Sequence, residues 1–227
     1  FVDTAGLRRR SRVEDPVERY SAIRTLRSIR SADVVLLLID PLEGATDQDK
    51  RIAGLTEEAG KGLIIAANKW DRVRELVMGD GSKERRLESL LEEARRNLEI
   101  AVRSALYFVD YAPFLVISAK TGHNIGLLIA KLKEVWSEHG RRLKTKEVND
   151  LLKLAVRLRP PSVAQGRSGR TAIKYGVQVA TRPPVFELRS PRAEEIDPSY
   201  LRYIENVFRQ HAGFIGTPLR FRLRSER

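Results

Sequence analysis

Three apolar runs alternate with amphipathic segments in the first part of the chain, and the runs begin at Val34, Leu63 and Pro113. Near-continuous apolar runs of this length are typical of parallel strands that are buried on both faces. The segments after them, residues 46–61, 82–106 and 124–140, have helical spacing and end signals. The pattern predicts an α/β fold, in which a parallel sheet is covered by helices. Ligands of such sheets bind beyond the carboxyl ends of the strands.

The rest of the chain has a different pattern, with strict alternation in "VFELR" and "FRLR". Alternation predicts strands with one packed face and one solvated face. We therefore expect two domains, residues 1–140 and residues 145–227, the second being a small α+β module with an antiparallel sheet. Its expected elements are a helix at Thr145–Leu158, strands at Ala172–Ala180 and Val185–Arg189, a helix at Ser199–His211 and a strand over residues 218–224.

The amino-acid composition indicates a globular protein without disulfides. Apolar residues make up 42% of the 227 residues, which is enough for a packed core. The chain has no cysteine, so disulfides and thiolate metal sites are excluded, and a reducing cytoplasm is the expected location. No stretch of about 18 residues lacks charged side chains, so the sequence predicts no membrane-spanning helix and no membrane partner.

The net charge of +12 is concentrated near the end of the chain, because residues 140–227 hold 19 Lys and Arg against 8 Asp and Glu. A localised basic excess favours an anionic partner, and nucleic acid is the leading candidate. The alternative is a solvated basic surface that has no dedicated ligand.

Three short polar motifs fall where a ligand site is expected. Two follow the second and third apolar runs, and one stands at the start of the chain after "FV". Helix caps and turns are the structural alternatives for each motif. The functional interpretation is a ligand site at the carboxyl ends of the strands. The motif residues are Asn68, Lys69, Trp70 and Asp71; Ser118, Ala119 and Lys120; and Asp3, Thr4, Ala5 and Gly6.

In this order the motifs resemble the guanine-nucleotide motifs of translation-factor-type P-loop GTPases. The resemblance implies that Asp71 selects guanine, that Asn68 binds the base edge and ties neighbouring loops, and that Lys69 lays its alkyl chain over the ring. The backbone N–H of Ala119 would reach guanine O6, and Lys120 would help to cover the base. Asp3 would hold Mg²⁺ through a water molecule, and the N–H of Gly6 would approach the γ-phosphate.

Longer stretches tighten the resemblance. "DTAGLRRRSRVEDPVERYSAIRTLRSIRSADVVLLLID", "YAPFLVISAKTGHNI", "YGVQVATRPPVFEL" and "SYLRYIENVFRQHAGFIGTP" are similar to the double-Era GTPase family, also called Der or EngA. The family implies two consecutive G domains and a C-terminal KH-like domain, hydrolysis of GTP to GDP and phosphate, and a role in assembly of the large ribosomal subunit through rRNA. The chain would then hold part of the second G domain, from DxxG onward, and the KH-like domain.

The phosphate half of a GTP site is not found in these residues. Gly-x-x-x-x-Gly-Lys-Ser/Thr, which cradles the phosphates, does not occur in the sequence. We therefore expect negligible GTPase activity and at most weak nucleotide binding from this chain alone, with no catalytic residue assigned in it. Leu7 follows Gly6 where Ras-like enzymes have a glutamine that orients water. The resemblance leaves open a monovalent cation, K⁺, as an additional cofactor.

Basic residues supply the candidate RNA contacts. Gly213–Gly216 has the Gly-x-x-Gly form of a KH clamp, but it follows a helix and precedes a strand, so we interpret Gly213 as a helix C-terminal cap. The runner-up function is a non-catalytic RNA- or ribosome-binding module on a degenerate G-domain scaffold. The candidate RNA contacts are Arg8, Arg9, Arg10, Arg167, Arg170, Lys174, Arg220, Arg222 and Arg224.

Overall fold

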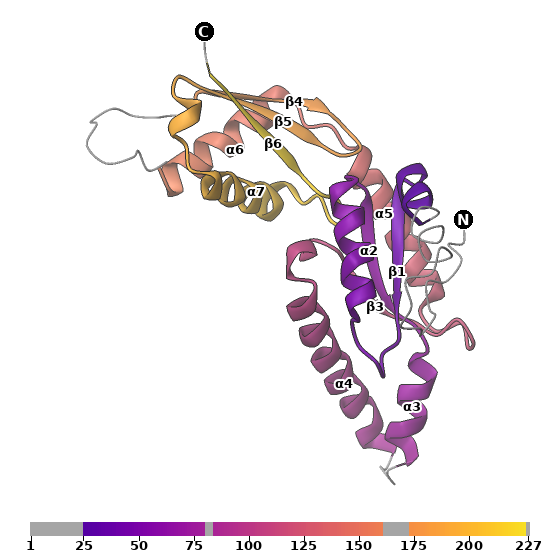
Figure 1. Cartoon of the computed structure of the whole chain (residues 1–227). Helices are drawn as coiled ribbons and strands as arrows, with labels where there is room; N and C mark the ends of the chain where they lie inside the picture. The colour runs from indigo at the N-terminus through magenta and orange to yellow at the C-terminus, as the bar shows by residue number, and fades with distance from the viewer. Residues whose placement is uncertain (1–24, 80–83, 161–172, 226–227) are drawn as a thin grey trace. The chain divides into compact units, whose positions relative to one another are not determined.

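The computed structural model describes residues 25–79, 84–160 and 173–225. The chain divides between Trp136 and Ser137 into two compact units (Figure 1). The elements are, in chain order, β1 (Val34–Ile39), α2 (Asp47–Glu58), β2 (Gly62–Ala67), α3 (Trp70–Gly79), α4 (Glu84–Ala105), η1 (Tyr107–Val109), β3 (Phe114–Val116), α5 (Ile125–Gly140), α6 (Thr145–Leu158), β4 (Tyr175–Ala180), β5 (Val185–Ser190), η2 (Ala193–Glu195), α7 (Pro198–Ala212) and β6 (Arg220–Ser225).

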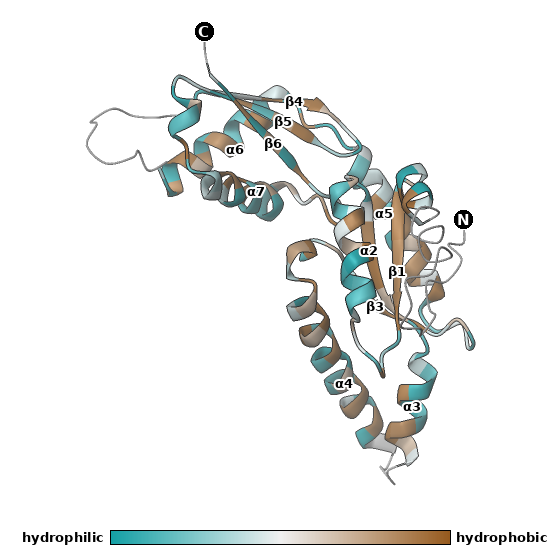
Figure 2. Cartoon of the chain, viewed as in Figure 1, coloured by the Kyte–Doolittle hydropathy of each residue, from teal (hydrophilic) through white to brown (hydrophobic). Residues whose placement is uncertain are grey.

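The first unit is built on a parallel sheet with the strand order β1-β2-β3. The central strand β2 is buried at every residue, which explains why its sequence is a continuous apolar run. β1 is hydrophobic along its length (Figure 2). The three strands confirm the parallel sheet that the apolar runs predict.

Helices cover both faces of this sheet, because successive strand residues point to opposite sides. On one face Leu63 and Ile65 of β2 pack in a core with residues of α2, α4 and η1. On the other face Ile64 and Ala66 pack against Leu128 and Val135, which belong to α5. The α/β fold class is therefore confirmed.

The helices of the first unit begin where local chemistry favours them. Thr46 caps α2: its Oγ1 accepts a hydrogen bond from the N–H of Asp49, whose carboxylate accepts one from the N–H of Thr46. The apolar pattern of the sequence does not predict α3, which occupies the residues directly after Asn68 and Lys69. Among the described residues, no helix is both long and apolar enough to cross a membrane.

The second unit has its own core, in which α6 and α7 contribute side chains to one face of a three-stranded sheet. Four phenylalanines form its centre. The ring of Phe186 lies 5.0 Å from that of Phe208, 5.9 Å from that of Phe214 and 5.2 Å from that of Phe221, measured between centroids. Aromatic contacts of this kind add to the free energy gained by burying the rings.

The sheet of the second unit is mixed, so the expectation of an antiparallel sheet is wrong for one strand. β4 and β5 are antiparallel, but β5 and β6 are parallel. The reason lies in the connection: the chain runs from β5 through α7 to β6, and a helical crossover joins parallel strands. The alternation in "FRLR" fixes which side chains face the core and does not encode strand direction. The strand predicted from Ala172 begins at Tyr175.

Glycine is needed at two places in the second unit. A Cβ on Gly176 would lie 2.4 Å from Cδ1 of Leu152, so α6 can approach β4 only if that atom is absent. Asn149 of α6 fastens the same contact, since its side chain donates to the carbonyl oxygen of Gly176 and accepts from its N–H. Gly213 ends α7 with φ of 85°, which confirms it as a helix cap. The next residue, Phe214, is fully buried.

Candidate functional site

Polar residues stand within two positions of the end of each strand of the first unit. Because the strands are parallel, their carboxyl ends meet at one edge of the sheet. The N–H of Asn68 donates to the carbonyl oxygen of Ile39 at 2.9 Å, and the N–H of Ile117 donates to that of Ala67 at 2.8 Å, so the strand ends are tied together. We call this group the strand-end cluster; it comprises Asp40, Asn68, Lys69, Trp70, Asp71, Ser118, Ala119 and Lys120.

Asp71 is the charged centre of the strand-end cluster. It stands in the first turn of α3, and its Oδ1 accepts a hydrogen bond from the hydroxyl of Ser118 at 2.7 Å. Lys120 lies on the other side, with Nζ 3.8 Å from Oδ2 of Asp71. The pKa of Asp71 is lowered from 3.8, chiefly by the Ser118 hydrogen bond, while burial opposes the shift and Lys120 adds to it. Asp71 is therefore a carboxylate at neutral pH.

The loop after β3 is held by Asn68 and by its own turn. Oδ1 of Asn68 accepts a hydrogen bond from the N–H of Ala119 at 3.0 Å. The Oγ of Ser118, which donates to Asp71, accepts a hydrogen bond from the N–H of Thr121 at 3.2 Å. Asn68 thus ties two loops, as the resemblance implies. The N–H of Ala119 is engaged in this contact, so a base oxygen has to share or replace it.

Lys69 has an unusual backbone and a buried partner. Its φ is 72°, in the left-handed region that L side chains rarely adopt. Its Nζ lies 2.8 Å from Oδ2 of Asp40, and the Asp40 side chain is only 6% exposed. Lys69 itself is 43% exposed along its side chain. The ammonium group is therefore anchored while much of the side chain stays accessible.

Trp70 and Lys120 occupy opposite environments. The Trp70 side chain is buried and packs with Ala67, Val73 and Val116, so it supports the cluster from within the core. The Lys120 side chain is 76% exposed. Trp70 is thus a predicted site residue whose side chain belongs to the hydrophobic core.

Sequence reasoning missed Asp40. It stands at the end of the first apolar run in the same way that Asn68 and Ser118 stand after the other two. The position after the strand was the signal that could have found it. Its pairing with Lys69 could not be read from the sequence, because it depends on the neighbouring register of β1 and β2.

Several predicted residues lie outside the described part of the chain. The expected Mg²⁺ ligand Asp3 is one of them, so the structure does not test the metal site. Among residues 25–79, 84–160 and 173–225, no group of three or more His, Asp or Glu side chains could hold a metal ion. The predicted residues outside the description are Asp3, Thr4, Ala5, Gly6, Leu7, Arg8, Arg9, Arg10, Arg167 and Arg170.

Arginines gather on the outer face of the sheet in the second unit. Register places Arg189 beside Arg224 and Val185 beside Arg220, and Arg222 lies between the two β6 arginines on the same side of the strand. We call Arg189, Arg220, Arg222 and Arg224 the basic sheet face. Glu187 partly balances it: its carboxylate oxygens lie 3.6 Å from Arg189 and 3.6 Å from Arg224.

The basic sheet face is open at most of its positions. The Arg189 and Arg224 side chains are 54% and 63% exposed, Arg222 is exposed and Arg220 is half-buried. Lys174 is exposed directly before β4, and its N–H donates to the carbonyl oxygen of Arg189. Four of the predicted RNA contacts, Lys174, Arg220, Arg222 and Arg224, therefore lie on or beside one sheet.

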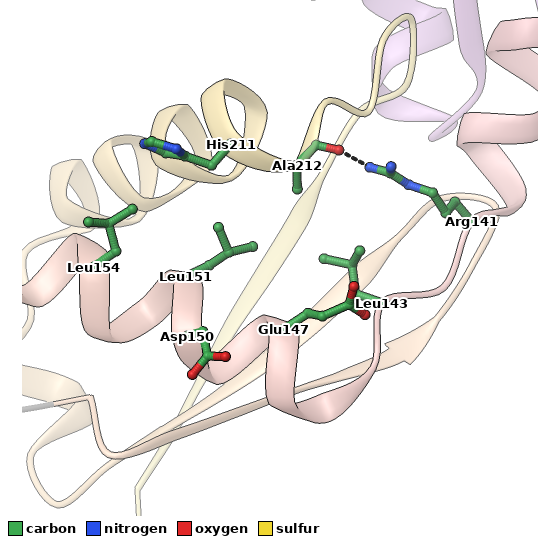
Figure 3. A pocket seen from close by; sticks show the side chains of 8 residues that line it. All are labelled: Arg141, Leu143, Glu147, Asp150, Leu151, Leu154, His211 and Ala212. Atoms are coloured by element: carbon green, nitrogen blue, oxygen red, sulfur yellow. Dashed lines mark hydrogen bonds between the residues drawn. The ribbon is translucent and has the colours of Figure 1, made fainter.

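A groove of about 480 Å³ lies in the second unit between α6 and the end of α7. Glu147 and Asp150 line it together with leucines of α6 (Figure 3). The guanidinium of Arg141 donates to the carbonyl oxygen of Ala212. None of the groove's residues belongs to the strand-end cluster or to the basic sheet face.

Comparison with known proteins shows two family matches. Residues 142–224 match the KH-domain-like domain at the C-terminus of EngA bacterial GTPase enzymes, and residues 20–159 match the elongation factor Tu GTP binding domain. The crystal structure of a probable GTP-binding protein engB is 22% identical, covers 60% of this chain and 75% of that chain, and superposes with a TM-score of 0.40. The assignment rests on the sequence matches.

Two curated relatives match over the whole chain. GTPase Der of Synechococcus sp. (strain JA-3-3Ab) is 42% identical over 227 residues, which are 100% of this chain and 46% of the relative. GTPase Der of Pelotomaculum thermopropionicum is 42% identical over 226 residues, which are 100% of this chain and 48% of the relative. The chain thus spans about half the length of these relatives. It belongs to the EngA family of GTPases, also called Der.

Proposed function

We propose that the whole protein that contains this chain binds GTP and hydrolyses it to GDP and phosphate, and that the strand-end cluster recognises the guanine base. The relatives named GTPase Der support the activity. The observation that carries the site is the Asp71 carboxylate, which Ser118 orients at 2.7 Å and keeps ionised.

The chemistry of the base explains the selectivity. Guanine presents the N1–H and the 2-amino group side by side, and an ionised carboxylate accepts both hydrogen bonds. Adenine presents a lone pair at N1 and has no 2-amino group, so it would leave Asp71 without a donor. Asn68 contacts the base edge, Lys69 lays its methylene groups on the ring and Lys120 covers the opposite side. Asp3 and Gly6 serve Mg²⁺ and the γ-phosphate.

We infer that water activation uses groups other than these side chains. Leu7, which follows Gly6, has no polar atom with which to orient water. Mg²⁺, and K⁺ as an additional cation, would neutralise charge that develops on the phosphates. This chain provides base recognition and, through Asp3 and Gly6, part of the contacts to Mg²⁺ and the γ-phosphate; the motif that cradles the phosphates does not occur in it.

The partner we propose is the rRNA of the large ribosomal subunit, with the protein acting in the assembly and stability of that subunit in the cytoplasm. The basic sheet face supports an RNA partner, because three of its four arginines are exposed and all four are closely spaced. Arginine contacts to phosphates position a protein on RNA without reading sequence. The alternative, a non-catalytic RNA-binding module on a degenerate scaffold, predicts that the strand-end cluster binds no nucleotide.

The deciding experiment changes Asp71→Asn in the whole protein and measures binding of GDP and of xanthosine diphosphate by equilibrium titration. Xanthine carries an oxygen in place of the 2-amino group, and the asparagine amide can donate to it. We expect GDP affinity at this site to fall by about 10- to 100-fold, which corresponds to about 1.4 to 2.8 kcal/mol. One xanthosine diphosphate per chain should bind in its place.

Asp110→Asn is the matched control, since it removes the same charge from an exposed residue in the first unit. It should leave both affinities unchanged. If Asp71→Asn gains no xanthosine diphosphate binding while the protein stays folded, Asp71 does not face the base. If the unmodified protein shows no guanine selectivity, the non-catalytic alternative is favoured.

A further inference from the structure

Asp40 has no role in the proposed recognition of guanine, yet its side chain is the least exposed of the four charged side chains in the strand-end cluster. Its side chain is 6% exposed, and both carboxylate oxygens are engaged. Oδ1 accepts a hydrogen bond from the N–H of Leu42 at 3.1 Å, and Oδ2 lies 2.8 Å from Nζ of Lys69. A buried carboxylate needs such partners, because burial without them is strongly unfavourable.

The backbone around the pair is fixed independently at both ends. The carbonyl oxygen of Asp40 accepts hydrogen bonds from the N–H groups of Glu43 and Gly44, which close a turn directly after β1. On the other strand, the N–H of Asn68 donates to Ile39. Asp40 therefore approaches Lys69 from a rigid turn, whereas Lys69 has the uncommon φ of 72°. The fixed position of Asp40 therefore determines where the flexible side chain of Lys69 places its ammonium group.

We propose that Asp40 is a positioning residue of the nucleotide site, which anchors the Lys69 ammonium so that the methylene chain of Lys69 faces the base. This inference rests on the proposed guanine site. The apolar stem and the charged head of a lysine act separately, because the stem can lie along an apolar surface while the ammonium is placed elsewhere. With the ammonium held by Asp40, the accessible part of Lys69 is apolar and suits the face of a purine ring.

Anchoring also protects the selective carboxylate. Asp71 stands two residues after Lys69, and Lys120 already lies 3.8 Å from its Oδ2. An ammonium released from Asp40 would be a second cation available to Asp71 and would compete with the base for the same oxygens. Asp40 thus acts on base binding through Lys69, without touching the nucleotide itself.

The test is a double-mutant cycle with Asp40→Asn and Lys69→Met, both placed in the whole protein carrying Asp71→Asn. Xanthosine diphosphate binding then reports this site alone. Because residue 71 has no carboxylate in this background, the cycle measures the placement of the Lys69 chain and not the protection of Asp71. Asparagine keeps an oxygen for the N–H of Leu42, and methionine keeps an apolar chain without the charge. We expect Asp40→Asn to weaken binding about tenfold when Lys69 is present and less than about twofold when Met replaces it.

A merely structural role of Asp40 in its turn would give the same loss in both backgrounds, and this result would overturn the proposal. Asp47→Asn is the matched control, because it breaks an exposed lysine pair of 2.9 Å in the same unit and should not change binding. If Asp40→Asn alone fails to fold, the variant with both changes leaves no unpaired charge and is compared with Lys69→Met. Absence of xanthosine diphosphate binding in Asp71→Asn itself would contradict the guanine site rather than the role of Asp40.

Discussion

The hydroxyl of Ser118 donates a hydrogen bond of 2.7 Å to Asp71 Oδ1 and so joins the ends of β3 and β2 across 47 positions of sequence. This contact is the main cause of the lowered pKa of Asp71. A carboxylate whose pKa is lower in the folded state than in the unfolded state stabilises the fold while it is ionised. The same bond therefore serves both the fold and the charge of the proposed site.

The first prediction concerns acid unfolding of Ser118→Ala. In the native sequence the stabilisation by Asp71 is fully present above its ordinary pKa of 3.8 and is lost as the pH falls through the lower folded value. Removing the hydroxyl raises the folded pKa toward 3.8, so the variant should be less stable at neutral pH and lose less stability below about pH 4. Urea unfolding over this pH range and carbon NMR of the Asp71 carboxyl measure both effects.

Ser104→Ala is the control for this change, because Ser104 is exposed on α4. Its stability curve should parallel that of the native chain at every pH. An unchanged Asp71 pKa in Ser118→Ala would show that the hydroxyl is not what lowers it.

The strand-end cluster was accessible to sequence reasoning because parallel strands have one direction. Once the apolar runs are assigned as parallel strands, Asn68 and Ser118 have to meet at the same edge, and the structure brings them together. α6 was predicted with its observed bounds, Thr145–Leu158, since its apolar spacing and its first-turn Glu147 are local signals. Signals of this kind can be read from the sequence because they do not depend on which elements pack beside the helix.

Features that depend on neighbours were missed. The direction of β6 follows from the crossover through α7, which alternation in one strand cannot reveal. The partnership of Asp40 with Lys69 follows from the pairing of β1 with β2. α3 is short and shares its first residues with a motif, so its apolar spacing gave too weak a signal.

The second prediction concerns the basic sheet face. Changing Arg189, Arg222 and Arg224 to Gln should weaken binding to large-subunit rRNA at every sequence tested, because the contacts go to phosphates. The slope of log affinity against log salt should become shallower by about 0.7 to 0.9 for each phosphate that the variant no longer neutralises. Filter binding at several salt concentrations measures the slope.

A matched triple variant separates position from net charge. Lys153, Arg157 and Arg202 are exposed on α6 and α7. The buried sides of these two helices pack against the inner face of the same sheet. Replacing these three with Gln removes the same charge and should leave the salt slope nearly unchanged. Equal losses of affinity from the two triple variants would mean that the basic sheet face has no special part in RNA binding.

The third prediction tests the contact between α6 and β4. Gly176→Ala places a methyl group 2.4 Å from Cδ1 of Leu152 and 3.0 Å from Cδ2 of Leu188, both in buried side chains. The helix and strand have to separate or the leucines have to leave their rotamers, so we expect a loss of about 1 to 3 kcal/mol in the free energy of unfolding. Chemical denaturation monitored by circular dichroism gives the value.

Gly126→Ala provides the contrast, since Gly126 lies in α5 and no atom comes within 4 Å of an added Cβ. An alanine there should stabilise the chain by up to about 1 kcal/mol, because the unfolded chain loses freedom and the helix gains a better former. Similar effects of the two changes would refute the close approach at Gly176.

The fourth prediction concerns Tyr200, whose burial raises its pKa from 10.0 to about 12. Its hydroxyl donates to the carbonyl oxygen of Arg159 at 2.7 Å, at the end of α6. Because the folded pKa exceeds the unfolded value, the stabilisation is fully present below about pH 10 and is lost as the pH rises through about 12. Tyr200→Phe should cost about 1 kcal/mol of folding stability at neutral pH and flatten this alkaline decline in stability.

Tyr107→Phe is the control and should do neither, because Tyr107 is 76% exposed. Ultraviolet titration of phenolate absorbance, recorded beside urea unfolding, should show a tyrosine that ionises near pH 12 in the native chain and is absent from Tyr200→Phe. If Tyr200→Phe removes no late-ionising tyrosine, burial does not raise the pKa of Tyr200.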